Sequence, residues 1–195
     1  MISENAKKLI ESVNFEPNIK QYIVYLIVRT KDGHPYTRTI GSYNVKTKDY
    51  FIEYFDFWRD ICDKCDARLY FKYNPNYYSD LKSFVKSRYI DYNGNNIETQ
   101  DEILNEFFYQ GARIIVSSPE FFIIDLDYPN FGILEQLNNY FILNNIKVQL
   151  KLETVAGVHI VLPIQYYSQI QKKFPNIGCY KQANVLVYAG KNIIV

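Results

Sequence analysis

The sequence predicts an α+β fold, because strand-like and helix-like segments alternate along the whole chain. Short runs rich in β-branched and aromatic residues recur, as at residues 22–30 and 146–154. Other segments place apolar residues at helical spacing, as at 47–65. Of the 195 residues, 48% are hydrophobic and 22% are charged. The chain can therefore build a full core, as one domain or two closely joined lobes.

The N-terminal segment is predicted to form a helix followed by a strand hairpin. Ser3 is a good N-cap for a helix over residues 3–13. Strands are expected at 22–30 and 36–45, and the Asp-Gly pair at 32–33 is a typical hairpin turn between them.

The rest of the first half is predicted to contain three helices and one strand. Aromatic residues at helical spacing predict a helix over 47–65, and a strand follows at 67–75, ending at Pro75. Two further helices are expected at 78–92 and 99–114, separated by an Asn-Gly-Asn-Asn break.

The last third of the chain has the predicted order β-α-β-β-α-β. That order is typical of the RRM-like arrangement, an antiparallel sheet with two helices on one face. The six elements are expected, in order, at 121–127, 130–145, 146–154, 158–163, 164–174 and 183–190. We therefore expect one unit over 1–195, with an N-terminal α+β lobe at 1–98 and an RRM-like lobe at 99–195.

Composition restricts the location and the partners. The formal net charge is +1, so the chain as a whole has no basic field to attract nucleic acid. No apolar run reaches the length of about 18 residues that a membrane helix needs, and the N-terminus lacks a signal-peptide core. With 3 cysteines, a reduced cytoplasmic location is expected. The 19 tyrosines suit base stacking, but an AT-rich gene gives the same bias.

Two carboxylates end one of the buried strands. The stretch FFIIDLDYPN, residues 121–130, carries Asp125 and Asp127 after four large apolar residues. Side chains alternate along a strand, so both carboxylates project from one face. Such a pair can chelate Mg²⁺ or Mn²⁺, which prefer hard oxygen ligands. The alternative is a strand end whose aspartates face water.

A histidine follows the next predicted hairpin. In ETVAGVHIVLP, residues 153–163, His159 lies two residues after Gly157. We expect this imidazole and the acid pair to converge on one face of the sheet, while a helix covers the other face. The alternative is a hydrogen-bonded structural imidazole.

Three segments together resemble the archaeo-eukaryotic primase (primase-polymerase) superfamily. They are FFIIDLD with the helix after it, TVAGVHIVLP, and ARLYFKYNP at 67–75, so the resemblance spans roughly residues 65–190. In this superfamily the catalytic lobe is RRM-like. Its first motif is an apolar strand ending in two acids, and its second is a small residue, a variable residue and a histidine.

The resemblance implies a small nucleotidyltransferase, as found in phages and mobile elements. Asp125 and Asp127 would hold Mg²⁺ or Mn²⁺ at the triphosphate of the incoming nucleotide, and His159 would contact the phosphates. The implied partners are nucleoside triphosphates, a single-stranded nucleic-acid template, and a helicase or another replication protein.

The resemblance also implies further nucleotide-binding residues. Gly157 matches the small residue of the second motif, where the superfamily often has serine. Arg68 and Lys72 would add positive charge to the nucleotide groove.

The sequence departs from the superfamily pattern in its third motif. Gln182 or Asn184 stands where an acidic residue is expected, and an amide brings no negative charge. Glu153 or Glu120 would then have to supply the missing carboxylate. Asn76 also stands where an arginine is usual.

Two other functions therefore stay open. One is a catalytically impaired relative of the same fold, which would act as a nucleic-acid-binding or replication-accessory protein. The other is an unrelated α+β interaction protein. A haloacid-dehalogenase phosphatase is disfavoured, because Tyr128-Pro129 follows the acid pair where that family has Gly-Thr.

Two further features have structural alternatives. Cys62 and Cys65 look like half of a zinc site, but no second pair is present, and their spacing also fits helix packing. The aromatic run at 70–78 would suit base stacking, but it also fits a strand followed by a Tyr-rich loop.

Overall fold

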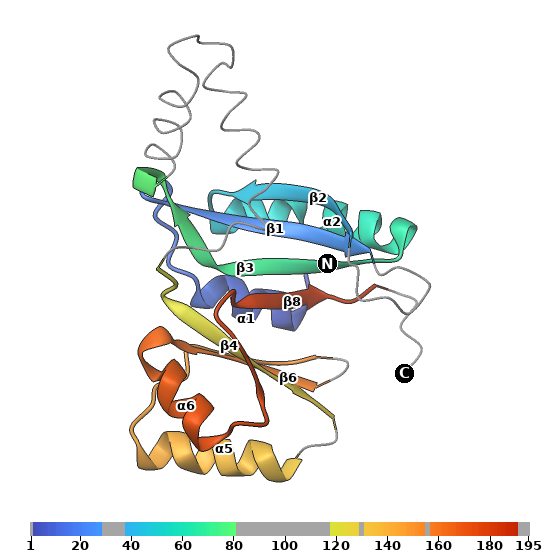
Figure 1. Cartoon of the computed structure of the whole chain (residues 1–195). Helices are drawn as coiled ribbons and strands as arrows, with labels where there is room; N and C mark the ends of the chain where they lie inside the picture. Colours follow the sequence, from blue (N-terminus) through green and yellow to red (C-terminus); the bar gives the residue numbers. More distant parts are fainter. Residues whose placement is uncertain (1, 29–37, 81–117, 129–130, 155–156, 191–195) are drawn as a thin grey trace, which may run out of the picture.

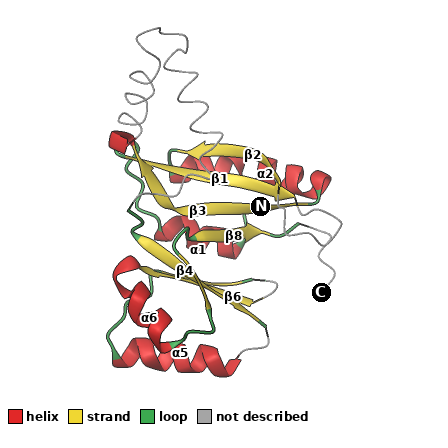
Figure 2. Ribbon diagram, viewed as in Figure 1, coloured by secondary structure: helices red, strands yellow, loops and turns green. Residues whose placement is uncertain are grey.

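In the part of the chain that it describes, the computed structural model has two four-stranded antiparallel sheets with helices packed on them (Figures 1 and 2). The α+β class expected from the sequence is therefore confirmed. The structure describes residues 2–28, 38–80, 118–128, 131–154 and 157–190. The helix expected at 99–114 and the turn at 32–33 lie outside these residues, as does most of the helix expected at 78–92.

Sheet A has the strand order β2-β1-β3-β8, and sheet B has the order β5-β6-β4-β7. The strands of sheet A are β1 (Lys20–Val28), β2 (Arg38–Val45), β3 (Ala67–Tyr77) and β8 (Asn184–Tyr188). The strands of sheet B are β4 (Phe121–Asp127), β5 (Leu150–Glu153), β6 (Gly157–Pro163) and β7 (Gly178–Tyr180). The described helices are α1 (Glu4–Ser12), α2 (Lys48–Cys65), α5 (Phe131–Leu143) and α6 (Tyr167–Lys173), the last preceded by a 3₁₀ turn at Ile164–Tyr166.

Local capping explains where the first two helices begin. The Ser3 hydroxyl accepts a hydrogen bond from the Ala6 N–H, and the Thr47 hydroxyl accepts one from the Tyr50 N–H. Helix α2 ends at Asp66, whose left-handed backbone conformation stops the helix. Because these signals are local, the sequence predicted both helices close to their observed bounds.

Two apolar cores hold the elements together. The first lies between sheet A and the helices α1 and α2, and it also takes in four residues of sheet B: Ile123, Leu150, Leu152 and Val161. The second lies between sheet B and the helices α5 and α6, which cover a single face of that sheet (Figure 1). One face of sheet B is thus covered by its own helices, while the other is turned partly toward sheet A.

Strand β3 runs further than the sequence predicted. The prediction that it ends at Pro75 is wrong, since it continues to Tyr77. Its register with β1 jumps between the pairs Ile23–Lys72 and Gln21–Asn76. Proline has no N–H to donate, and this irregularity, where the ladder is interrupted, is a place where a strand tolerates it.

The closing strand of the chain lies in the other sheet from the one expected. The sequence suggested that residues 183–190 complete the C-terminal sheet, but β8 pairs with β3 through Lys72–Asn184 and Phe71–Val185 (Figure 1). The short strand β7 takes the fourth place in sheet B, beside β4. The burial of Val185 and Val187 in the first core stabilises this exchange. Periodicity in the sequence identifies a strand but not its distant partner.

None of the helices that the structure describes is long and apolar enough to span a membrane.

Candidate functional site

The acid pair projects from the face of sheet B opposite α5 and α6, the face that packs partly against sheet A and α1. Along β4 the residues Phe122, Ile124 and Leu126 are buried in the second core, against α5 and α6. Asp125 and Asp127 alternate with them and are exposed. The face that carries the two carboxylates is therefore opposite α5 and α6.

His159 lies directly beside the first of these aspartates. The two residues are register partners on β4 and β6, and the His159 Nε2 atom is 3.2 Å from the Asp125 Oδ1 atom. The Asp125 side chain is 43% exposed, whereas His159 is only 7% exposed. The other ring nitrogen, Nδ1, accepts a hydrogen bond of 3.4 Å from the Leu186 N–H of β8. Both ring nitrogens thus have partners in the protein.

Gly157 is required by the close approach of β6 to β4. It is the register partner of Asp127. A Cβ atom built on Gly157 would lie 1.7 Å from the Leu126 carbonyl oxygen and 2.9 Å from the Asp127 Cα atom. Both neighbours are backbone atoms, so no side-chain rotation relieves the clash. The glycine in the second motif therefore has a packing role in this structure.

The two glutamates considered as a third acid lie elsewhere. On β5, Leu152 is the partner of His159, so the next residue, Glu153, points to the opposite face. Glu120 precedes the start of β4, at the end of the strand away from Asp125 and Asp127. Within the described ranges, no group of three or more His, Cys, Asp and Glu side chains is placed to hold a metal ion.

The two amides at the third-motif position lie in β8 of sheet A and in the connection that precedes it. Gln182 is exposed in the connection between β7 and β8, and Asn184 lies on β8 opposite Lys72. Neither adds negative charge to the acid pair. Asp125 and Asp127 are exposed hard oxygen donors on one face, which fits a cation such as Mg²⁺ that keeps several waters and binds one or two carboxylates together with substrate phosphates.

An exposed aromatic ring lies on the same face as the acid pair. Strand β7 pairs with β4 through Asp125–Gly178 and Ile123–Tyr180, so Tyr180 projects on the side of Asp125. Tyr180 is 52% exposed. A Cβ atom on Gly178 would be 3.0 Å from the Tyr180 ring, so the ring lies over this glycine. Tyr180 was not predictable as a site residue from the sequence, because its place depends on the pairing of β7 with β4.

The two cationic residues expected at the nucleotide groove lie on β3 of sheet A. Arg68 is half-buried. Lys72 is only 4% exposed, and its Nζ atom donates a hydrogen bond of 2.9 Å to the Asn76 Oδ1 atom. Burial lowers the pKa of Lys72 from 10.5 to about 8. Lys72 is thus a buried residue of sheet A in this structure.

The lowered pKa of Lys72 predicts a pH-dependent stability. Below about pH 8 the ammonium is protonated in both the folded and the unfolded chain, and its burial lowers the free energy of unfolding. Between pH 8 and 10.5 the folded protein releases the proton first, so stability rises. We expect the free energy of unfolding of wild type, relative to that of Lys72→Met, to rise by about 2–3 kcal/mol between neutral pH and pH 10.5. Urea unfolding of both proteins measures the change. A difference that stays constant with pH would contradict this.

Asn74 is a structural residue whose role the sequence did not reveal. Its Nδ2 atom donates to the carbonyl oxygens of Phe121 and Lys181, each at 2.9 Å. Its Oδ1 atom accepts from the N–H groups of Glu120 at 3.1 Å and Phe121 at 2.9 Å. Asn74 therefore ties β3 to the start of β4 and to the β7–β8 connection. The sequence feature that could have indicated this role is an asparagine directly before a proline within a predicted strand.

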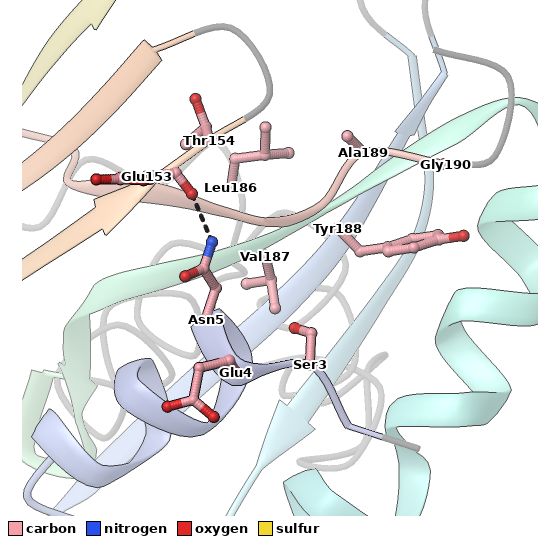
Figure 3. Close-up of a pocket in the computed structure, with 10 residues that line it drawn as sticks. All are labelled: Ser3, Glu4, Asn5, Glu153, Thr154, Leu186, Val187, Tyr188, Ala189 and Gly190. Atoms are coloured by element: carbon pink, nitrogen blue, oxygen red, sulfur yellow. Dashed lines mark hydrogen bonds between the residues drawn. The ribbon is translucent and has the colours of Figure 1, made fainter. Parts of the chain in front are cut away.

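A cavity of about 530 Å³ lies between the start of α1, the end of β5 and β8 (Figure 3). The Asn5 Nδ2 atom donates a hydrogen bond to the Glu153 carbonyl oxygen across it. Its lining includes Leu186, whose N–H reaches His159, but neither Asp125 nor Asp127. Among the described residues that line it, Glu4 and Glu153 are acidic and none is a lysine or an arginine.

Of the two cysteines on α2, Cys62 is explained by helix packing. Cys62 is buried in the first core, where burial raises the pKa of its thiol to about 12, and Cys65 is exposed. A thiol with a raised pKa is a poor metal ligand, because metals bind the thiolate.

Comparisons of this chain with protein-family models, with curated proteins and with solved structures found no match.

Proposed function

We propose that this chain is a primase-polymerase-like nucleotidyltransferase, in which Asp125 and Asp127 bind Mg²⁺ or Mn²⁺ together with a nucleoside triphosphate. The observation that carries the proposal is the exposure of both carboxylates on one face of sheet B, the face opposite α5 and α6. The order β5-β6-β4-β7, with two helices on one face, supports an RRM-like lobe. The motifs that resemble the superfamily supply the reaction type.

The exposed ring of Tyr180 beside the acid pair favours a nucleotide as the ligand over a bare cation. The bound metal would neutralise the triphosphate and orient the attacking 3′-hydroxyl. Asp125 and Asp127 hold that metal, leaving its other coordination positions to water and phosphate oxygens. Tyr180 offers an exposed ring on the same face for stacking against a base of the nucleotide or of a single-stranded template.

A second candidate function is a catalytically impaired nucleic-acid-binding or replication-accessory protein of the same type. One observation favours it: Glu120 and Glu153 both lie away from the acid pair, so neither supplies a third carboxylate. Such a protein would bind metal and nucleotide without forming a phosphodiester bond. A helicase or another replication protein would be its natural partner.

The experiment that tests the proposal is Mn²⁺-dependent nucleotide incorporation on a primed single-stranded template. We expect wild type to extend the primer and the double variant Asp125→Asn/Asp127→Asn to fall to background, because the neutral amides no longer hold the cation. The matched control is Glu153→Gln, which removes one carboxylate from the opposite face and should keep full activity. Circular dichroism checks that the variants are folded.

The possible results separate the functions. Incorporation that depends on the acid pair supports the nucleotidyltransferase. No incorporation, together with Mn²⁺-dependent triphosphate binding that the double variant loses, supports the accessory protein. If calorimetry shows that wild type binds neither Mn²⁺ nor triphosphate, both forms of the proposal are wrong.

A further inference from the structure

We propose that His159 is a positioning residue, which fixes Asp125 for metal binding and joins β8 of sheet A to the site, and that it does not contact the phosphates. This inference rests on the proposed metal site at Asp125 and Asp127. It differs from the role that the resemblance implied for this histidine, and it follows from the two contacts of the imidazole.

The hydrogen bond from β8 determines the tautomer of the His159 ring. Among the described strands, β8 is at the edge of sheet A, so its outward N–H groups have no neighbouring strand there. The Leu186 N–H instead donates to the Nδ1 atom of His159. A nitrogen that accepts a hydrogen bond carries no proton, so the neutral imidazole has its proton on Nε2.

The other ring nitrogen of His159 orients the Asp125 carboxylate. The Nε2 atom, 3.2 Å from the Asp125 Oδ1 atom, donates its proton to that carboxylate oxygen. This contact orients the carboxylate and occupies one oxygen, while 43% of the side chain remains exposed toward solvent. Residues that hold a metal ligand in this way typically change metal affinity by about 10- to 100-fold when removed.

The burial of His159 limits the access of a phosphate to its ring nitrogens. His159 is only 7% exposed, and a phosphate oxygen would have to displace Asp125 or Leu186 to reach a ring nitrogen. Its burial among neighbours from both sheets fits a residue that links β8 to Asp125.

Two substitutions separate the two contacts. In His159→Asn the side-chain oxygen lies near the place of Nδ1 and can accept from the Leu186 N–H, but no donor reaches Asp125. In His159→Gln the longer amide places a donor near Nε2, but the Leu186 N–H loses its acceptor. We therefore expect His159→Asn to weaken Mn²⁺ binding by about tenfold or more, and His159→Gln to stay within about threefold of wild type.

Thermal unfolding gives the complementary readout. His159→Gln should lower Tm more than His159→Asn, because it leaves the partly buried Leu186 N–H without its acceptor. A purely structural histidine would make affinity and stability change together in both variants, and that result would overturn the proposal. Weaker triphosphate binding at unchanged Mn²⁺ affinity in either variant would also overturn it, because it would make His159 a phosphate ligand.

Imidazole ¹⁵N NMR tests the contact without any metal. We expect the Nε2–H tautomer in wild type and a shifted Nε2 resonance in Asp125→Asn. An Nδ1–H tautomer, or an Nε2 resonance that ignores the substitution, would refute the positioning role. If wild type binds no Mn²⁺ but the NMR results are as expected, the metal function fails while the hydrogen-bonded link stands.

Discussion

Replacement of Asn74 by alanine is expected to lower the free energy of unfolding by about 3–5 kcal/mol. The side chain is 1% exposed and makes four hydrogen bonds, all to backbone groups. Its loss leaves two N–H groups and two carbonyl oxygens without these partners at the junction of the two sheets. Urea unfolding, followed by circular dichroism, measures the change.

A second variant distinguishes these hydrogen bonds from simple loss of volume. Asn74→Asp keeps the shape and the acceptor, but its carboxylate has no donor for the Phe121 and Lys181 carbonyls and places a charge in a buried site. Burial raises the pKa of that carboxyl above its unfolded value, so the variant should lose further stability as the pH rises through the folded pKa. The control Asn139→Ala, at an exposed position of α5, should change stability by less than about 0.5 kcal/mol. Equal effects at Asn74 and Asn139 would contradict the structural role.

Hydrogen bonds of Asn74 and His159 connect sheet A to sheet B. Asn74 joins β3 to the start of β4, and His159 joins β8 to the end of β4 that carries the acid pair. The position of Asp125 therefore depends on hydrogen bonds from sheet A at both ends of its strand. Asn74, in the N-terminal half of the chain, thus helps to position the strand of the C-terminal half that carries both carboxylates.

Local signals made much of the fold predictable from sequence. Ser3 and the aromatic face of 47–65 marked α1 and α2, and alternation along 121–127 placed both aspartates on one face. These features depend on residues a few positions apart, where capping and periodicity act.

The features that the sequence did not reveal depend on distant pairing. The burial of Val185 and Val187 beside β3, rather than any property of residues 183–190 alone, takes β8 into sheet A. Only the placement of β8 in sheet A brings the Leu186 N–H to His159 and the Lys181 carbonyl to Asn74. The partners of both residues were therefore not predictable from local patterns.

Alanine at Gly157 is expected to cost about 2–4 kcal/mol of stability and to weaken Mn²⁺ binding. The new Cβ atom would meet the Leu126 carbonyl oxygen at 1.7 Å, so β4 and β6 must separate where Asp127 is held. The control is Gly132→Ala on α5, where a Cβ atom meets nothing within 4 Å. In a helix this change should stabilise by up to about 1 kcal/mol. If both alanine variants unfold at the same urea concentration as wild type, β6 does not approach β4 closely at Gly157, and the packing reason for a glycine before His159 is wrong.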